Sequence, residues 1–597
     1  MADTRSVQER FWGPRAAQAQ LDEIQRFAEQ IHRLADGELD PDDFKKFRLE
    51  NGVYGIRGTM DEQMIRVKIK RGALTAEQLD VLAAIAERYA DPKVGHITTR
   101  QNVQFHHVKR AEVPTVLQML ADVGLTTREA CGNTVRNVTA CPYAGVSADE
   151  VFDVTPYADA VARYFLRHPV CQDLPRKFKI AFEGCPEDHA RTPIHDVGAV
   201  AAIQQAVDGG EPVRGFKLYV GGGLGTTPFS AILLEEFTPA DLLIPSIETV
   251  LRLFDRYGER KDRNRARIKF LIHKTWGPEE FIKRFQQERK YTILTSPGKA
   301  DWHIEPVEPV APPKPRIPAS FSLPTSAFEA WRASNVFTQK QPGYVGVHVR
   351  CPLGDVTVPQ MRGLAEVARK YCGGRMRVTI RQNLFLSWVP EEALLPLYQD
   401  LVRLGVAHAG ADELVDVTRC PGADTCQIAI TRSRGLAAQM DALFNNGGRP
   451  LLSSETLRHL QIKISGCPNS CGQHHIADLG FSGTAKSING RTVPHYRIYV
   501  GGGTVEGQAT FGTAIGQTPA QRTPEAAKHL LTLYRDERQG QETFRQWAER
   551  VGTERLTKTL DPFQTLPPFE QDPKAYEDLG AEGVEFKVSI GKGECAS

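Results

Sequence analysis

Four cysteines in the second half of the sequence have the spacing of ligands for a metal ion or an iron–sulfur cluster. The segments TRCPGADTCQIA and SGCPNSCGQ carry two each, Cys420 and Cys426 as C-x5-C and Cys467 and Cys471 as C-x3-C. Four thiolates bind either zinc or an iron–sulfur cluster. Paired cysteines of zinc modules are usually separated by about two to four residues. The longer C-x5-C arm therefore favours a [4Fe–4S] cluster.

Disulfides are not expected in this chain, and metal or redox use is favoured for any cluster of its cysteines. The chain has 11 cysteines, an odd number in a large protein that we expect to be intracellular, so disulfides are disfavoured. His474 and His475 directly follow the C-x3-C pair. A histidine is more often a packing or hydrogen-bonding residue than a metal ligand, and we assign neither to the metal.

The composition is that of a soluble globular protein with several domains. The 597 residues are too many for one core, and the formal net charge of +2 indicates neither nucleic acid nor a membrane as partner. The polar N-terminus lacks the apolar segment of a secretory signal. The chain also contains no apolar run long enough to span a membrane. We therefore expect a cytoplasmic protein.

Sequence repeats indicate that one fold occurs twice in the chain. TTRQNVQFHHV at 98–108 matches TIRQNLFLSWV at 379–389, and YVGGG occurs at 219–223 and at 499–503. EGCPEDH at 183–189 matches SGCPNSC at 465–471. These matches keep one order and nearly one separation, 280 to 282 residues. Chance does not explain such agreement, so we predict two similar halves.

The elements that must position the cysteines follow the same order in both halves. A strand with alternating apolar residues, MIRVKIK or YVGVHVR, precedes a helix and a second strand with Arg-Gln-Asn. Another helix and further strands follow, which predicts an α+β class. A proline-rich stretch between the halves should be an extended linker.

The first half lacks part of the cysteine set. Cys185 matches Cys467, but His189 stands where the second half has Cys471. One copy therefore keeps the metal site and the other is released from it. This pattern predicts one active site, shared between the halves.

The cysteine quartet, the duplication and the Arg-Gln-Asn strands resemble the siroheme-dependent sulfite and nitrite reductases, closest to the ferredoxin-dependent sulfite reductases. The resemblance covers residues from about 45 to 570. It implies an internally duplicated, pseudo-twofold α+β fold with two half-parachute, ferredoxin-like pieces and two reductase domains. The expected boundaries are an N-terminal helical extension at 1–45, ferredoxin-like pieces at 46–125 and 326–410, reductase domains at 126–304 and 411–570, the linker at 305–325 and a C-terminal tail at 571–597.

The resemblance also implies the cofactors, siroheme and a [4Fe–4S] cluster. Cys420, Cys426, Cys467 and Cys471 would hold the cluster, and Cys471 would also bridge to the siroheme iron. Such a bridge couples a one-electron store to the catalytic iron of a six-electron reduction.

Four cations of the family's substrate face map onto this sequence. They are Arg66 in MIRVKI, Arg136 in NTVRNVT, and Lys177 and Lys179 in LPRKFK. Arginine and lysine can hold a small anion and relay protons as its oxygens leave as water. The resemblance therefore implies a catalytic role for these side chains.

Further polar residues are candidates to bind siroheme, whose carboxylates need many donors. Arg100 and Gln104 in TTRQNVQF would alternate on one strand face, and Asn137 follows in VRNV. Asn469, between the two cysteines of CPNSC, is a candidate donor to the porphyrinoid or to a sulfur.

One position bears on the choice between sulfite and nitrite. In the nitrite-reducing branch the second lysine of the Lys-x-Lys pair is typically asparagine, whereas this chain keeps Lys179. A dianion such as sulfite gains more from an added cation than monoanionic nitrite does. We therefore expect sulfite as the main substrate and nitrite as a side activity, with a ferredoxin–nitrite reductase as the alternative.

A second clue lies in ENGVYGIRG and REACGNT. In some ferredoxin-dependent members a tyrosine and a cysteine beside the siroheme are covalently joined, and Tyr54 and Cys131 occupy the matching positions. We expect a thioether between them. The alternative is an unlinked aromatic ring beside a small buried thiol.

The sequence contains no flavin or nicotinamide fingerprint, so electrons should come from another protein. We expect ferredoxin, docking near the cluster on basic residues such as Arg432 and Arg434, and an NADPH-dependent flavoprotein stays an alternative. A monomer is expected because the duplication supplies the twofold partner. A siroheme-fold monooxygenase of corrin synthesis and a zinc-stabilised binding protein are the competing classes, and a siroheme absorption spectrum would exclude the zinc protein.

Overall fold

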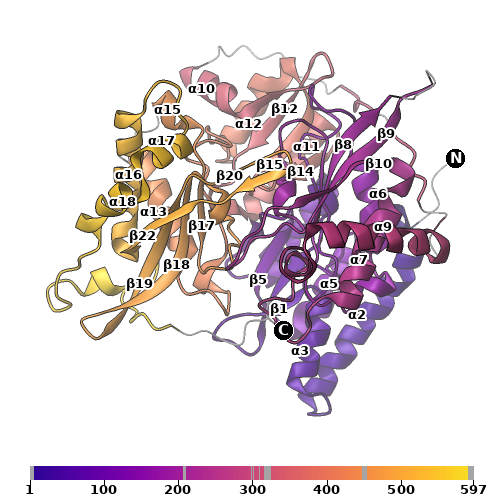
Figure 1. Cartoon of the computed structure of the whole chain (residues 1–597), viewed down its shortest axis with the longest axis horizontal. Helices are drawn as coiled ribbons and strands as arrows, with labels where there is room; N and C mark the ends of the chain where they lie inside the picture. The colour runs from indigo at the N-terminus through magenta and orange to yellow at the C-terminus, as the bar shows by residue number, and fades with distance from the viewer. Residues whose placement is uncertain are drawn as a thin grey trace.

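The structure is a computed structural model that describes residues 6–205, 210–296, 299, 302–307, 309–314, 325–446 and 454–588. Four five-stranded sheets, two in each half of the chain, are covered by helices. Figure 1 shows the final sheet, with β17, β18, β19 and β22, on the left and β8, β9 and β10 of the first half at the upper right. The duplication and the α+β class predicted from the sequence are confirmed.

Two of the sheets are small and antiparallel, and each takes one strand from the other half. The orders are β1-β2-β5-β4-β13 and β11-β12-β15-β14-β3. β13 pairs with β4, and β3 pairs with β14. The first half supplies β1 (Val53–Gly55), β2 (Glu62–Val67), β3 (Ala73–Thr75), β4 (Val94–Ile97) and β5 (Val103–Lys109), and the second β11 (Val336–Thr338), β12 (Tyr344–Val349), β13 (Asp355–Thr357), β14 (Arg375–Val378) and β15 (Leu384–Pro390).

The strand exchange makes one core from both ferredoxin-like units. Leu82 on α4 and Leu364 on α11 are fully buried in the same apolar cluster, and α4 packs against α11. Apolar residues at helical spacing give each helix the face that it buries there. The sequence repeats predicted two units but gave no sign of this exchange.

The other two sheets are mixed. Their orders are β10-β9-β8-β7-β6 and β16-β17-β18-β19-β22. In the first sheet β6, β7 and β8 are parallel, and in the second β16, β17 and β18 are parallel. The first sheet contains β6 (Thr139–Ala140), β7 (Ile180–Glu183), β8 (Val197–Gln204), β9 (Val213–Val220) and β10 (Ile232–Pro239). The second contains β16 (Thr418–Arg419), β17 (Ile462–Ser465), β18 (Leu479–Ile488), β19 (Arg491–Val500) and β22 (Thr513–Pro519), beside a hairpin of β20 (Gly503–Val505) and β21 (Gln508–Thr510).

Helices cover the outer faces of the sheets. The first half carries α1 (Val7–Trp12), α2 (Pro14–Ala35), α3 (Pro41–Glu50), α4 (Ala76–Tyr89), α5 (Val113–Asp122), α6 (Thr155–Phe165), α7 (Leu243–Tyr257), α8 (Ile268–Phe270) and α9 (Pro278–Thr295). The second carries α10 (Ser326–Asn335), α11 (Val358–Cys372), α12 (Leu394–Arg403), α13 (Ser433–Asn446), α15 (Glu455–Arg458), α16 (Thr523–Glu537), α17 (Phe544–Val551) and α18 (Thr553–Lys558). None of the described helices is long and apolar enough to cross a membrane.

The Arg-Gln-Asn segments form turns, and the expectation that Arg100 lies on a strand with Gln104 was wrong. Arg100 falls between β4 and β5, and Gln101 has a positive φ of 53°. The Gln101 amide fixes this turn because it donates to the Ala140 carbonyl and accepts from the Ala140 amide, both at 3.0 Å. Gln382 repeats the turn in the second half with φ 67°.

The Gly-Gly-Gly turns pack against backbone. A Cβ at Gly222 would lie 2.2 Å from the Pro193 carbonyl oxygen, and one at Gly502 would lie 2.4 Å from that of His475. The close approach that these glycines permit is therefore to the protein's own chain. Residues 315–324 of the expected linker and residues 589–597 of the expected tail, which include Cys595, lie outside the described residues.

Candidate active site

Parallel pairing of β16 and β17 brings the cysteine quartet together. Cys420 directly follows β16, and Cys467 follows β17 after one glycine, so both leave the same sheet edge. Short turns return the chain to Cys426 and Cys471. Burial raises the pKa of the Cys467 thiol well above its usual range, and repulsion from Cys471, Cys420 and Cys426 adds to the rise. The structure thus collects all four predicted thiols.

This set of thiols fits a [4Fe–4S] cluster. Thiolates that raise each other's pKa need a positive centre among them, which the iron atoms supply. The Gly466 amide donates to Cys420 Sγ at 3.2 Å, and the Ser433 hydroxyl lies 3.3 Å from the same sulfur. Such polar contacts to sulfur help to set a cluster's reduction potential. Cys471 is the exposed member of the quartet, which leaves its sulfur accessible to a second group.

A hydrogen bond links the second-half cysteine turn to the first half. Thr99 Oγ1 donates to the Cys471 carbonyl oxygen at 3.1 Å. Thr99 directly precedes Arg100, so the turn that carries Arg100 lies beside the exposed thiol. Sequence reasoning did not identify Thr99, because a threonine bonded to backbone has no local sequence signal.

Arg100 is half-buried among other cations. Its Nη1 lies 3.0 Å from His195 Nε2, and Nη2 donates to the Asn137 carbonyl. His195 Nδ1 faces the Arg191 carbonyl oxygen at 2.7 Å, so its Nε2 is the acceptor for Arg100. Burial and the nearby guanidinium of Arg136 lower the pKa of Arg100 to about 9.

Arg66 and Gln104 face each other across β2 and β5, where they are register partners. With its amide oxygen turned toward Arg66, Gln104 accepts hydrogen bonds from Nε at 2.8 Å and Nη2 at 2.6 Å. Arg66 Nη1 also donates to the Tyr54 hydroxyl at 3.2 Å. Gln104 therefore orients Arg66, which is half-buried.

Arg136 is held by backbone carbonyls of the loop that contains Cys131. Its Nη1 donates to Ala130 at 3.1 Å, and its Nη2 donates to Gly132 at 2.7 Å. The Arg136 amide donates to the Phe178 carbonyl, which aligns this segment with the two lysines.

Lys177 and Lys179 flank Phe178, which is fully buried, so both side chains leave the opposite side of the chain. Burial lowers the pKa of Lys179 well below its ordinary value, and repulsion from Arg100, Arg267 and Lys177 lowers it further.

Positive charge exceeds negative charge in this region. Asp196 is a carboxylate close to Arg100 and Lys179, and Arg267 already pairs with both of its oxygens at 2.7 and 2.8 Å. The predicted cations Arg66, Arg100, Arg136, Lys177 and Lys179 interact with one another or with shared neighbours. Cations held this close together repel one another, and a bound anion offsets that repulsion. The carboxylates of siroheme and an anionic substrate have the required charge.

The two predicted asparagines have different surroundings. The Asn137 amide donates to the carbonyls of Ile69 at 2.6 Å and Arg100 at 3.1 Å, so these donors hold backbone. Its Oδ1 is buried without a hydrogen-bond partner among the described residues. Asn469 is exposed between the two cysteines of its turn.

Tyr54 and Cys131 belong to one small buried apolar cluster with Leu49 and Met64. The Arg66 guanidinium carbon lies 4.9 Å from the centre of the Tyr54 ring. The pair therefore lies next to Arg66, one of the cations predicted to bind substrate.

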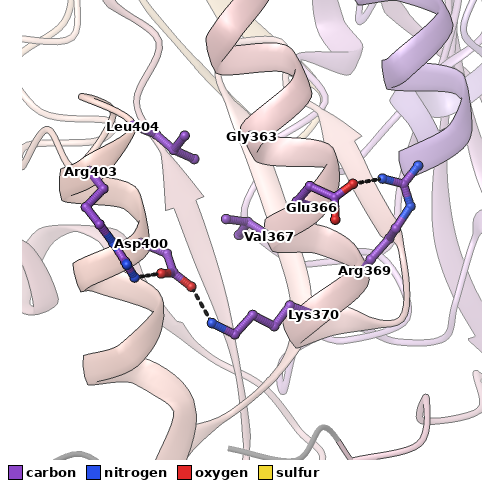
Figure 2. A pocket seen from close by; sticks show the side chains of 8 residues that line it. All are labelled: Gly363, Glu366, Val367, Arg369, Lys370, Asp400, Arg403 and Leu404. Atoms are coloured by element: carbon purple, nitrogen blue, oxygen red, sulfur yellow. Dashed lines mark hydrogen bonds and ion pairs between the residues drawn. The ribbon is translucent and has the colours of Figure 1, made fainter. Parts of the chain in front are cut away.

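A surface pocket between α11 and α12 contains none of the predicted site residues (Figure 2). Lys370 and Arg403 both pair there with Asp400, so the charges of this pocket are satisfied internally.

A thiol quartet beside a crowded group of cations is the arrangement of an iron–sulfur redox enzyme. The family model for the nitrite and sulphite reductase 4Fe-4S domain matches residues 131–292 and 410–564. The model for the nitrite/sulfite reductase ferredoxin-like half domain matches residues 57–123 and 337–404. The chain belongs to the nitrite and sulfite reductase family, and its cofactors are siroheme and a [4Fe–4S] cluster.

Individual relatives carry both activities in their names. An assimilatory ferredoxin-dependent nitrite reductase of Haloferax mediterranei is 31% identical, with 91% of each chain covered. A sulfite reductase [ferredoxin] of Mycolicibacterium paratuberculosis is 29% identical, with 83% of each chain covered. The structure of Mycobacterium tuberculosis NirA protein matches with a TM-score of 0.73 and 27% identity over 87% of this chain and 92% of that one.

Proposed function

We propose that this enzyme reduces sulfite to sulfide with six electrons supplied by ferredoxin. Cys420, Cys426, Cys467 and Cys471 hold the [4Fe–4S] cluster, and Cys471 also contacts the siroheme. Siroheme supplies the iron at which the substrate is reduced. Arg100 would bind carboxylates of the siroheme, Gln104 and Asn137 would support this face of the pocket, and Asn469 would contact the cofactor beside Cys471.

The remaining cations bind the substrate. Arg66 and Arg136 both donate to the Ala130 carbonyl, at 3.4 and 3.1 Å, which fixes two guanidinium groups side by side. Planar donors of this kind suit the oxygens of a small oxyanion. Lys177 and Lys179 add ammonium groups that can give protons to departing oxygens.

The observation that favours sulfite is the position of Lys179 in this group. Arg100, Arg267 and Lys177 lower the pKa of the Lys179 ammonium group, and a bound anion would favour its charged form. A dianion gives about twice the Coulomb gain of a monoanion at equal distance. Nitrite is the second candidate, since the Haloferax relative is named as a nitrite reductase.

Steady-state kinetics with a chemical one-electron donor test the substrate. We expect a higher kcat/KM for sulfite than for nitrite with the purified holoenzyme. A kcat/KM for nitrite far above that for sulfite would replace this proposal with the nitrite alternative.

Ferredoxin is proposed as donor because the relatives above are named as ferredoxin-dependent. The predicted docking arginines are partly neutralised, since Arg432 pairs with Asp424 at 3.4 Å and Arg434 with Asp355 at 2.6 Å. Activity with reduced ferredoxin should exceed activity with NADPH and a flavoprotein reductase, and the reverse order would exclude ferredoxin as the main donor.

A further inference from the structure

The first half contains a second cluster of metal-ligand side chains, separate from the cysteine quartet. Cys141, Glu183, Cys185 and His189 each offer one ligand atom, and these four atoms all lie within 4.8 Å of one another. The two cysteines and Glu183 are buried, and the His189 side chain is 20% exposed. None of these four residues belongs to the predicted siroheme or substrate residues described above.

The duplication explains how these groups come together. β6 and β7 are parallel, as β16 and β17 are, so Cys141 and Cys185 leave one sheet edge just as Cys420 and Cys467 do. Cys141 stands 279 residues before Cys420. The chain has therefore kept two of the four thiol positions in the first half.

The other two positions carry different side chains. Ser147 stands where the second half has Cys426, and His189 stands where it has Cys471. The Ser147 amide bonds to the Tyr143 carbonyl as the Cys426 amide bonds to that of Gly422, so the two turns match. Two thiols cannot supply the four thiolates of a cubane cluster, but two thiols and an imidazole suit a single ion.

Distances within the cluster fit tetrahedral coordination. His189 Nδ1 lies 3.6 Å from Cys141 Sγ and 3.8 Å from Glu183 Oε1. Tetrahedral zinc, with bonds of about 2.3 Å to sulfur and 2.0 Å to nitrogen, places such a sulfur and nitrogen about 3.6 Å apart. The separation of 3.8 Å from the carboxylate is too long for a hydrogen bond.

The Nε2 atom of His189 lies near a carboxylate, as the second ring nitrogen of a metal-bound histidine usually does. His189 Nε2 lies 3.5 Å from a carboxylate oxygen of Glu187, which leaves Nδ1 to face the thiols. Backbone amides of Cys185 and Ala190 donate to Glu183 at 3.0 and 2.7 Å and orient that carboxylate. A carboxylate behind the imidazole fixes its tautomer and strengthens it as a ligand.

We propose that Cys141, Cys185, His189 and Glu183 bind one zinc ion in the first half of the chain. Two thiolates and an imidazole favour zinc over the oxygen-binding ions magnesium and calcium. The ion joins the turn after β6 to the loop after β7. In the second half the iron–sulfur cluster joins the two equivalent segments. The zinc ion thus stabilises the first half in the way that the cluster stabilises the second.

Metal analysis of the holoenzyme tests this proposal. Protein produced with zinc in the medium should contain close to one zinc per chain, in addition to the iron of its cofactors. Zinc K-edge absorption should show two sulfur neighbours at about 2.3 Å and nitrogen or oxygen neighbours at about 2.0 Å. Zinc below about a tenth of an equivalent would overturn the proposal, as would a disulfide linking the Cys141 and Cys185 peptides.

Variants locate the ion. Cys185→Ala and, as a milder change, His189→Gln should each lower zinc content at least about tenfold while the siroheme absorption remains. Cys372→Ala is the matched control, because this buried cysteine donates to the Ala368 carbonyl in the ferredoxin-like core. Zinc that stays in both site variants, or is lost from the control as well, would place the metal elsewhere. The zinc K-edge absorption measurement on the wild-type holoenzyme still tests the proposal if Cys185→Ala does not fold.

Discussion

Thr99 Oγ1 donates a hydrogen bond to the carbonyl oxygen of Cys471 at 3.1 Å. The two residues come from opposite halves of the chain. Thr99 is next to a proposed siroheme contact, and Cys471 is itself a proposed cofactor contact. Thr99 precedes Arg100, and Cys471 is the exposed thiol of the quartet. The bond therefore places the turn that carries Arg100 in one half against the turn that carries Cys471 in the other, as a single site shared between the halves requires.

Replacing Lys179 with asparagine should impair sulfite reduction more than nitrite reduction. Losing one charge-assisted contact costs about 1.5 to 3 kcal/mol, or about tenfold to a hundredfold in kcat/KM for the dianion. For nitrite the Coulomb loss is about half as large, so about threefold to tenfold is expected. Steady-state assays of the holoenzyme on both anions measure the difference.

The matched control is Lys486→Asn, which removes an exposed lysine of β18 outside the cation group. It should leave both values of kcat/KM unchanged. An equal loss for sulfite and nitrite in Lys179→Asn would contradict the proposal that this charge selects the dianion.

The pH dependence of sulfite reduction should change when Lys179 becomes arginine. Burial and the cations Arg100, Arg267 and Lys177 lower the pKa of Lys179, although Asp196 opposes this shift. The protonated amine binds the anion, so activity is present below this pKa and falls as pH rises through it. Arginine stays charged over the accessible range, so Lys179→Arg should move the basic limb of kcat/KM to higher pH.

Profiles of the two proteins, measured with the same chemical donor, provide the test. Lys486→Arg should reproduce the wild-type profile. If the basic limb of the kcat/KM profile stays at the same pH in Lys179→Arg, that limb reflects the titration of another group.

Arg100 and Arg381 occupy equivalent turns but have different partners. Arg381 Nε lies 3.2 Å from Asp412 Oδ1, whereas Arg100 is crowded by cations. The Arg100→Met enzyme should therefore show much less siroheme absorption for a given content of cluster iron than the wild-type enzyme does. Arg381→Met should keep siroheme but lower the unfolding free energy by about 1 kcal/mol, because the Asp412 side chain is 37% exposed and still accepts a hydrogen bond from Tyr143.

Absorption spectra, iron content and thermal melts distinguish the two variants. Retention of siroheme in Arg100→Met with full occupancy would exclude Arg100 as a principal contact. Loss of siroheme from both variants would show that the second turn also contributes to the pocket.

The sequence predicted the duplication and the thiol quartet because each leaves a local pattern. The strand exchange of β3 and β13 left none, since three-residue strands are too short for a periodic signal. Thr99 and His195 were missed because their roles depend on contacts across the chain. Cys141 had a signal in the shared Thr-x-Cys-Pro of TACPYAG and TRCPGAD, but without the parallel strands its link to His189 was hidden.

A thioether between Tyr54 and Cys131 is the remaining prediction about the substrate face. Both side chains lie in one buried cluster, and the Tyr54 hydroxyl accepts a hydrogen bond from Arg66. A covalent link would hold the ring, and through it the Arg66 guanidinium, in one orientation. Intact-mass measurement of the denatured wild-type chain should show a loss of two hydrogens.

Cys131→Ala should give the mass calculated for its sequence, and so should Tyr54→Phe, which lacks the phenol needed for coupling. Cys171→Ala is the control, because Cys171 is equally buried but lies in another apolar cluster, and it should keep the two-hydrogen deficit. A wild-type mass without the deficit would remove the thioether. Arg66 would then be oriented by Gln104 and by an unmodified tyrosine, so a loss of sulfite reduction in Tyr54→Phe would reflect the hydrogen bond alone.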